Sequence, residues 1–375
     1  MREKRIIISG GGTGGHIFPA ISIANALKRV EPDCEILFVG ALGRMEMEKV
    51  PAAGYRIAGL PVSGLKRSLS LSNLKLPFMF VKSIIEAGRI IKKFKPDAAV
   101  GVGGYASFPL LKAASLKKIP YIIQEQNSYA GVTNKLLAKK ASKICVAYEG
   151  MEKFFPAGKI LLTGNPVRST IKRATPQEQM DAKAGYGFGT ETPVLLVVGG
   201  SLGAGTLNTA VKKWILENAQ SNIGIIWQCG KYYYDQSVLF NQSNPRSFVQ
   251  CFEFISNMEE ALAAADVVIS RAGAGTISEL CIAGKATIFV PSPNVAEDHQ
   301  TANAMALTSK GAALMVRDNE APSILMAEAM KLLNDRDTIE KLEKSMLGMA
   351  LYGSDEKIAG QVLSLINSSK EGEKL

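Results

Sequence analysis

The chain has 375 residues, of which 47% are hydrophobic, and this length allows two domains that each bury a sizeable core. Its five cysteines are scattered without a C-x-x-C pair, and no run of about 18 uncharged apolar residues occurs, so we expect no disulfide framework, zinc site or membrane span. Residues 1–163 carry 25 Lys and Arg against 11 Asp and Glu, and such a basic half suits nucleic acid, an anionic membrane or an acidic substrate.

Short apolar, β-branched runs alternate with helix-like stretches along the whole chain. Uninterrupted apolar runs are typical of parallel strands that are buried on both faces. The sequence therefore predicts an α/β fold built on doubly wound parallel sheets. The expected strands lie within residues 5–10, 35–40, 98–104, 121–126, 143–148, 194–200, 224–230, 248–254, 266–273 and 286–293.

The two halves of the chain open in the same way, with a buried strand that ends in a glycine loop before a helix. These segments read "IIISGGGTGGH" and "LLVVGGSLGAG" and indicate two Rossmann-like domains in series. Because Gly164, Asn165 and Pro166 interrupt the pattern, we place the domains at 1–165 and 166–347. We expect a C-terminal helix at about 348–370 to pack back on the first domain, and ligands to bind between the domains at the strand ends.

The first glycine loop satisfies G-x-G-x-x-G with Gly10, Gly12 and Gly15. A nicotinamide dinucleotide site also needs an acidic residue after the second strand, but that strand ends "FVGALG". The fingerprint is incomplete, which disfavours a dehydrogenase. The loop still offers backbone N–H groups at a helix start, where an anion or a developing oxyanion could bind.

His16 follows this loop in the first turn of the predicted helix. One interpretation is a histidine that helps to cap the helix. The other is a general base, because imidazole suits proton transfer near neutral pH and the positive helix end would keep it neutral. The position at the expected binding edge favours the base. His299 in the second half is either a ligand contact or a solvated loop residue.

A second constellation, "SRAGAGTISE", follows a predicted strand at residues 270–279. Its glycine loop and Thr276 could present N–H groups and a hydroxyl to a diphosphate, while Glu279 could accept both hydroxyls of a ribose. The alternative is purely structural, with Thr276 as helix N-cap and Glu279 compensating the helix dipole. The pattern alone leaves both readings open.

Seven motifs then occur in the order, and at roughly the spacing, of one enzyme family: "GGGTGGHIFPA", "GVGGYASFP", "EQNSYAGVTNK", "GNPVR", "GGSLGA", "FEFISNM" and "RAGAGTISE". Over about residues 5–350 the chain resembles the MurG family, within glycosyltransferase family 28. The resemblance implies the GT-B fold, with two Rossmann-like domains facing across a cleft. It also implies a peripheral enzyme at the cytoplasmic face of the cell membrane that moves N-acetylglucosamine from its UDP donor to lipid I, which gives lipid II for peptidoglycan synthesis.

The same resemblance implies roles for individual residues. On the donor side these are Glu279 at the ribose, the main chain of Ile255 at the uracil, Arg168 near the nucleotide, Gln300 at the sugar hydroxyls, and Ser201, Gly273, Ala274, Gly275 and Thr276 at the diphosphate. On the wall of the first domain, Thr13, Gly14 and Gly15 would bind UDP-N-acetylglucosamine where its sugar meets the acceptor, with Asn127 close by as a further contact. His16 is the implied base, and Glu125 is a second candidate for orienting or proton transfer. The chain departs from the family where Gln124 replaces a frequent His, and where Leu202 and His299 replace frequent Gln.

A segment at residues 65–95 is both basic and apolar, and it could contact the membrane that holds the implied lipid acceptor. Eight basic residues and one acid alternate there with large apolar side chains, a composition that suits docking on an anionic leaflet or a helix with a solvated basic face. The residues expected to touch the membrane are Leu71, Leu74, Lys75, Phe78, Phe80, Lys82 and Arg89.

The expected chemistry is a single inverting displacement, in which a base deprotonates the acceptor hydroxyl while N–H groups and Arg168 stabilise the leaving diphosphate. No cofactor is implied, a divalent cation would be at most accessory, and other cell-wall synthesis proteins are possible partners. The alternatives are a transferase for another lipid acceptor, such as diacylglycerol, or a UDP-N-acetylglucosamine 2-epimerase on the same fold. A nucleic-acid partner is disfavoured because no RNA-recognition signature occurs.

Overall fold

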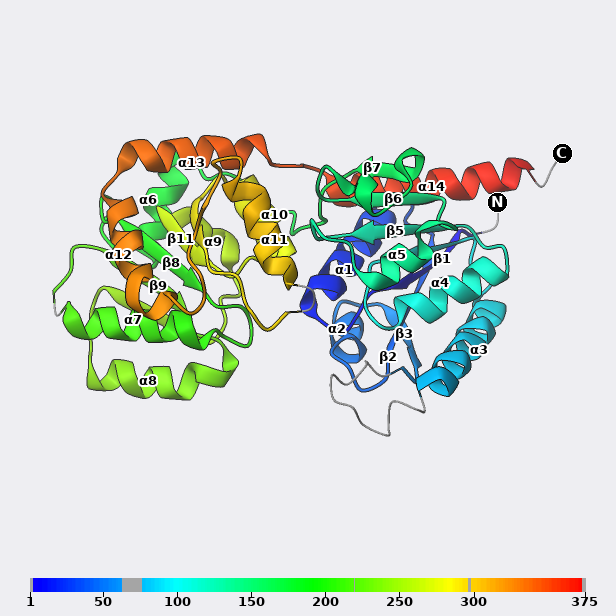
Figure 1. Ribbon diagram of the computed structural model, residues 1–375, viewed down its shortest axis with the longest axis horizontal. Helices are drawn as coiled ribbons and strands as arrows, with labels where there is room; N and C mark the ends of the chain where they lie inside the picture. Colours follow the sequence, from blue (N-terminus) through cyan, green and yellow to red (C-terminus); the bar gives the residue numbers. More distant parts are fainter. Residues whose placement is uncertain (1–2, 63–75, 219, 296–297, 373–375) are drawn as a thin grey trace. The chain divides into compact units, whose positions relative to one another are not determined.

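The computed structural model describes residues 3–62, 76–218, 220–295 and 298–372. The chain forms two compact units, Met1–Val167 with Tyr352–Leu375 and Arg168–Leu351 (Figure 1). Each unit is a parallel sheet with helices packed against it, so the predicted α/β architecture with two parallel sheets is confirmed.

The first unit has the sheet order β3-β2-β1-β4-β5-β6-β7, in which the strand order reverses between β1 and β4. The strands are β1 (Arg5–Ser9), β2 (Glu35–Ala41), β3 (Arg56–Leu60), β4 (Ala98–Gly101), β5 (Tyr121–Glu125), β6 (Lys143–Val146) and β7 (Ile160–Leu162). The α-helices are α1 (Gly14–Val30), α2 (Glu46–Ala52), α3 (Leu76–Phe94), α4 (Ser107–Leu116), α5 (Val132–Ala138) and α14 (Ser354–Gly372), with short 3-10 turns η2 (Met151–Lys153) and η3 (Ala157–Lys159).

Both faces of this first sheet are covered, which explains why its central strands are apolar without alternation. Ile6 and Ile8 belong to a core that includes residues of α1 and α14. Ile7, on the opposite face of β1, belongs to a second core that includes residues of α3, α4 and α5. Helix α14 packs against α1, so the C-terminal helix completes one of the two layers over this sheet.

The second unit has the sheet order β10-β9-β8-β11-β12-β13, which reverses between β8 and β11. Its strands are β8 (Val194–Val198), β9 (Gly224–Gln228), β10 (Val249–Phe252), β11 (Val267–Ser270), β12 (Ala286–Phe289) and β13 (Leu314–Met315). Its α-helices are α6 (Pro176–Gly185), α7 (Gly205–Glu217), α8 (Tyr234–Ser243), α9 (Met258–Ala264), α10 (Ala274–Ala283), α11 (His299–Thr308), α12 (Ala321–Leu333) and α13 (Arg336–Gly348), and η4 (Lys231–Tyr233) precedes α8.

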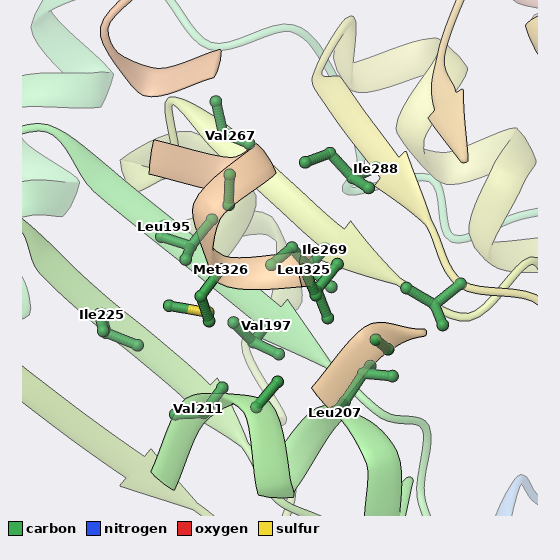
Figure 2. Packing of buried hydrophobic residues seen from close by; sticks show 14 of the residues in the cluster. Leu195, Val197, Leu207, Val211, Ile225, Val267, Ile269, Ile288, Leu325 and Met326 are labelled. Atoms are coloured by element: carbon green, nitrogen blue, oxygen red, sulfur yellow. The ribbon is translucent and has the colours of Figure 1, made fainter. Parts of the chain in front are cut away.

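One face of the second sheet forms a core with α7 and α12. Figure 2 shows Leu195 and Val197 of β8 in one cluster with Leu207 and Val211 of α7 and with Leu325 and Met326 of α12. These side chains are almost completely removed from water. This core packs against the central strands β8 and β11, and the carboxyl ends of these strands carry two glycine-containing loops.

Three strands were not expected from the sequence, and all three lie at or next to a sheet edge. They are β3, β7 and β13, and each is short or partly exposed. Edge strands need no continuous apolar run because one side of the strand faces away from the sheet. The C-terminal helix expected at about 348–370 is α14 (Ser354–Gly372), and α13 (Arg336–Gly348) precedes it.

Lys285 is a buried ammonium group at the start of β12, on the side of the sheet away from the glycine loops. Its Nζ donates to the carbonyl oxygen of Ala265 at 2.7 Å. Burial lowers the pKa of Lys285 to about 8, and the nearby carboxylates of Glu343 and Asp266 only partly oppose that shift. Since the pKa in the unfolded chain is about 10.5, the unfolded state binds more protons between these values, and stability rises with pH through that window.

We therefore expect Lys285→Met to remove the pH-dependent destabilisation that the buried ammonium group causes. The free energy of unfolding of the wild type, relative to the variant, should increase by about 2 kcal/mol between pH 7 and pH 10. Urea denaturation at the two pH values measures this difference. Lys213→Met, which removes an exposed lysine of α7, is the control and should show no such change. A wild-type to Lys285→Met difference that stays constant with pH would contradict the assignment.

Candidate functional site

In the first unit, two glycine loops meet where the strand order reverses. Residues 10–15 follow β1 and residues 102–106 follow β4, and the N–H of Gly11 donates to the carbonyl oxygen of Gly103 at 3.4 Å. Gly12, Gly103 and Gly104 have positive φ angles of 87°, 98° and 88°. A Cβ at Gly104 would overlap the backbone of Gly11, so the two loops pack main chain against main chain.

His16 lies half-buried in the first turn of α1, in contact with both loops. Its Nδ1 is 3.3 Å from the hydroxyl oxygen of Thr13, and a Cβ at Gly103 would lie 2.9 Å from its Nε2. Thr13 is the N-cap residue, but its side chain makes no capping bond. The imidazole therefore lies between the Thr13 hydroxyl and Gly103, and the lack of a side chain at Gly103 leaves room for the ring. Thr13 and Gly15 are exposed beside it, and Gly14 is partly buried.

Glu125, the last residue of β5, is buried and receives hydrogen bonds from three residues of the following loop and helix. Its Oε1 accepts from the N–H and the Nδ2 of Asn127, at 3.1 and 3.3 Å. Its Oε2 accepts from the N–H of Gly131 at 3.0 Å and from Nδ2 of Asn134 at 2.9 Å. Burial raises the pKa of Glu125, and these hydrogen bonds oppose the shift. The carboxyl group thus orders the loop that carries Asn127, and Asn134 is a partner that the sequence reading missed.

Gln124, at which the resemblance implied a departure from the family, is completely buried in the first unit. Its Nε2 donates to Oδ1 of Asn165 at 3.0 Å, and its Oε1 accepts from Nε2 of Gln126. The side chain is thus fully engaged in an internal amide network next to Glu125.

In the second unit, the loop 199–205 follows β8 and the loop 271–276 follows β11, again where the strand order reverses. The N-cap of α10 is Gly273, so Ala274, Gly275 and Thr276 form its first turn and Thr276 is not the capping residue. The purely structural reading of this motif is therefore wrong in its capping part. The first-turn N–H groups lie at the positive end of α10, where anions bind favourably.

Glu279 lies one turn further along α10 and is paired with Arg168. Arg168 Nε donates to Glu279 Oε1 at 2.9 Å and its NH2 group to Oε2 at 3.5 Å, with 14% of the Glu279 side chain exposed. Burial raises the pKa of Glu279, and the Arg168 guanidinium opposes that shift. The structure thus brings together two residues that the sequence separates by more than 100 positions.

The other residues that the sequence predicts for the donor side make contacts within the second unit. Ser201 is exposed in the β8 loop, where its carbonyl oxygen accepts from the N–H of Lys231. The N–H of Ile255 donates to Oε1 of Gln228 at 2.9 Å, a contact that the sequence does not predict. Gln300, in the first turn of α11, accepts from the N–H of Ser292 at 2.9 Å and thereby fixes the loop after β12.

Arg271 is a further residue of this edge that sequence reasoning missed, although it begins the motif "RAGAG". Its NH1 group donates to the carbonyl oxygens of Val290 and Pro291 and to Oδ1 of Asp318, and its NH2 group reaches the hydroxyl of Thr206. One side chain thus joins the loops after β11 and β12 to the start of α7. A charged side chain directly before a glycine loop is the sequence signal that could have identified Arg271.

The predicted membrane residues fall partly outside the described chain. Leu71, Leu74 and Lys75 lie outside the described residues, as does the side chain of Phe78. Phe80, Lys82 and Arg89 are exposed on α3, with Phe80 against the ring of Phe108 on α4. Within the described ranges, no helix is long and apolar enough to cross a membrane. Nor do the described His, Cys, Asp and Glu side chains form a group of three that could hold a metal ion.

Family models and relatives match almost the entire chain. Residues 6–146 match the glycosyltransferase family 28 N-terminal domain, and residues 194–356 match the family 28 C-terminal domain. A protein of Parabacteroides distasonis is 53% identical over 98% of this chain and 100% of its own length. Its name is UDP-N-acetylglucosamine--N-acetylmuramyl-(pentapeptide) pyrophosphoryl-undecaprenol N-acetylglucosamine transferase.

Solved structures agree with this match. The crystal structure of Acinetobacter baumannii MurG is 28% identical, with a TM-score of 0.78 over 96% of this chain and 99% of that one. A UDP-N-acetylglucosamine 2-epimerase is only 14% identical, with a TM-score of 0.64 over 97% of this chain and 96% of that one, and this likeness shows the fold alone. The two parallel-sheet units, both family models and the 53% identical relative together show that the chain has the GT-B fold and belongs to glycosyltransferase family 28, in the MurG family.

Proposed function

We propose that this protein is an inverting N-acetylglucosaminyltransferase that moves N-acetylglucosamine from its UDP donor to the C4 hydroxyl of N-acetylmuramic acid in lipid I, which gives lipid II for peptidoglycan synthesis. The observation that carries the proposal is the 53% identity with the Parabacteroides transferase over 98% of the chain. The second unit supplies the N–H groups of the α10 start and the Glu279–Arg168 pair, which suit the donor, and the first unit supplies His16 beside the Thr13 hydroxyl, which suits the acceptor.

The second unit is the proposed donor-binding domain. The first turn of α10, from Ala274 to Thr276, suits the diphosphate, because its N–H groups lie at the positive helix end. Glu279 is the proposed ribose partner, and Arg168 holds its carboxylate in place beside that helix turn. Ser201 is proposed to face the diphosphate as well. The main-chain carbonyl of Ile255 suits the uracil, since its N–H is taken by Gln228. The amide of Gln300 suits the sugar hydroxyls.

We expect Glu279→Gln to weaken donor binding. The amide keeps the shape but loses the charge that accepts two hydroxyls and pairs with Arg168, so the Kd for UDP should rise about tenfold or more. Isothermal titration with UDP measures this Kd. Glu340→Gln, which changes an exposed carboxylate on α13, is the matched control and should bind UDP like the wild type. Unchanged UDP binding by Glu279→Gln would remove Glu279 from the donor site.

The first unit is the proposed acceptor-binding domain. Thr13, Gly14, Gly15 and Asn127 would contact the sugars, and His16 would take the proton from the acceptor hydroxyl as it attacks the anomeric carbon. The hydroxyl of Thr13, 3.3 Å from Nδ1, is suited to orient the ring. Glu125 already accepts four hydrogen bonds from its own unit, and this favours an orienting role through Asn127 over proton transfer.

The reaction needs no covalent enzyme intermediate. The bond from the acceptor oxygen to the anomeric carbon forms as the bond to the UDP oxygen breaks, the proton goes to His16, and the α-linked donor gives a β-linked product. Negative charge on the leaving diphosphate would be stabilised by the first-turn N–H groups of α10 and by Arg168. No cofactor takes part in this scheme.

We expect His16→Ala to lower kcat by about a hundredfold or more while UDP binding stays unchanged, because a general base acts only in the chemical step. The assay is transfer of labelled N-acetylglucosamine from its UDP donor to a short-chain lipid I analogue, with UDP-glucose as donor control. A diacylglycerol acceptor and an assay for epimer without acceptor test the two alternative functions. Product from His16→Ala at nearly the wild-type rate would assign the proton transfer elsewhere.

The acceptor's lipid chain calls for a membrane surface, and we propose that α3, α4 and α5 provide it at the cytoplasmic leaflet. Helix α4 packs against both α3 and α5, so their outer faces adjoin. Exposed apolar residues on these helices include Phe80, Val81, Ile85, Leu116, Val132 and Leu136. Exposed cations beside them include Lys82, Arg89, Lys112, Lys117, Lys139 and Lys140. Apolar groups rimmed by cations suit an anionic bilayer.

We expect the double variant Lys82→Glu with Arg89→Glu to bind anionic vesicles at least about tenfold more weakly, since each cation near such a surface contributes about 1 kcal/mol. Co-sedimentation with phosphatidylglycerol vesicles at low salt measures the partition coefficient. Lys213→Glu on the second unit, with a similarly exposed lysine, is the control and should bind like the wild type. Equal binding by all three proteins would rule out this surface.

A further inference from the structure

Glu46 is a nearly completely buried carboxylate to which the proposed function gives no role. It is the first residue of α2 in the first unit, and only 1% of its surface is exposed. Removing a charge from water is unfavourable unless hydrogen bonds or opposite charges replace the lost solvation. The contacts of this side chain therefore indicate why the fold keeps it there.

Two backbone N–H groups solvate this carboxylate. Oε2 accepts from the N–H of Gly12 at 2.9 Å, and Oε1 accepts from the N–H of Ala41 at 2.9 Å. Gly12 belongs to the loop between β1 and α1, and Ala41 is the last residue of β2. The carboxylate thus ties the glycine loop to the end of the neighbouring strand through two charge-assisted bonds.

Two glycines make room for this side chain. A Cβ at Gly11 would overlap Oε1 of Glu46, and a Cβ at Gly40 would lie 2.5 Å from its Cγ. A side chain at either position would therefore displace Glu46 from the place where it makes its two hydrogen bonds. Gly11 is among the residues of the glycine motif in "SGGGTGG" that would otherwise be attributed to ligand approach alone.

The glycine loop is held from its other side by the β4 loop. Gly11 donates to Gly103, and Gly103 is also the residue against which the His16 ring packs. The loop, the imidazole and the β4 loop therefore form one packed group, with Glu46 fixing its β2 side. The bond to Glu46 also engages the Gly12 N–H internally, next to a negative charge, which disfavours a bound phosphate at that point of the loop.

We infer that Glu46 is a positioning residue for the transfer reaction: its buried carboxylate sets the conformation of the loop 10–15 and, through it, the place of His16. This inference rests on the proposed function, because His16 and the loop act there on the acceptor. Glu46 touches no reacting atom in this scheme and acts through Gly12. Glu46 should therefore affect the reaction of the acceptor and leave donor binding by the second unit unchanged.

The test compares Glu46→Gln with Asp97→Asn. Glutamine keeps the shape of Glu46 but can accept from only one of the two N–H groups and turns an N–H donor toward the other. Asp97 is the matched control because its carboxylate also accepts from a backbone N–H, that of Arg5 at 2.7 Å, at the opposite end of the same strand β1. Both variants remove a charge-assisted bond to the backbone of one sheet, and only one of them lies at the glycine loop.

Two readouts are needed. With the lipid I analogue, Glu46→Gln should lose about tenfold in kcat/KM for the acceptor while the Kd for UDP stays within about twofold of the wild-type value. Hydrogen exchange followed by mass spectrometry, which needs no substrate, should show faster exchange of the peptide covering residues 10–18 in Glu46→Gln, and no change there in Asp97→Asn. Glu46→Asp, which keeps the charge on a shorter stem, should lie between wild type and Glu46→Gln, and it replaces Glu46→Gln if that variant does not fold.

Two outcomes would overturn the inference about Glu46, and a third would contradict the proposed function. Unchanged acceptor kinetics with unchanged exchange of residues 10–18 would overturn the inference. So would a loss of activity that merely follows the folded fraction, with the same KM for both substrates and the same behaviour in Asp97→Asn. A wild type that transfers nothing would contradict the proposed function, and the exchange comparison alone would then decide whether Glu46 holds the loop.

Discussion

Direct contact of main chain with main chain, at the carboxyl ends of the central strands, is the constraint on which both units depend. In the first unit, the loop after β1 lies against the loop after β4, where Gly104 meets Gly11. In the second unit, the loop after β8 lies against the segment after β9, where Gly230 has no room for a Cβ beside Gly203. Neither contact leaves room for a side chain. The backbone therefore requires glycine at the same sheet edges that carry the candidate residues.

The two units use this constraint differently. The first loop is closed on the β4 side by Gly103 and Gly104 and on the β2 side by the carboxylate of Glu46. The loop after β8 is instead closed on the β9 side, by Gly230, and its edge continues into the start of α10 after β11. Similar strands and similar glycine spacings thus produce two different edges. The first edge holds the buried carboxylate of Glu46, and the second edge carries the start of α10, which is the proposed diphosphate site.

The parts of the structure that the sequence predicts are those that local pattern determines. The runs around Ile7 and Leu195 are apolar on both faces because helices cover both faces, and their strands could be placed from composition alone. The short or exposed edge strands β3, β7 and β13 carry no such run and were missed. The glycine loops and the resemblance to the MurG family identified the candidate residues, whose roles remain predictions.

What the sequence could not give were the partners of those residues. The pairs Glu46 with Gly12, Arg168 with Glu279, and Arg271 with Asp318 join residues that are distant in the chain. The sequence does not distinguish a carboxylate that the fold buries from an exposed polar residue between two elements, because only the fold removes it from water. Glu125 illustrates the point, since its four hydrogen bonds become visible only once the loop that follows β5 is in place.

The C-terminal helix has a consequence for how the chain can be divided. Helix α14 belongs to the first unit, where Ile358, Val362 and Ile366 share a core with Ile17 of α1. The second unit is therefore an insertion within the first, with both of its ends joined covalently to it. A fragment that ends near residue 167 would expose the apolar face of α1 and invite aggregation. Chimeras between relatives of this family should accordingly exchange the internal segment 168–351 and keep the last helix with its own first unit.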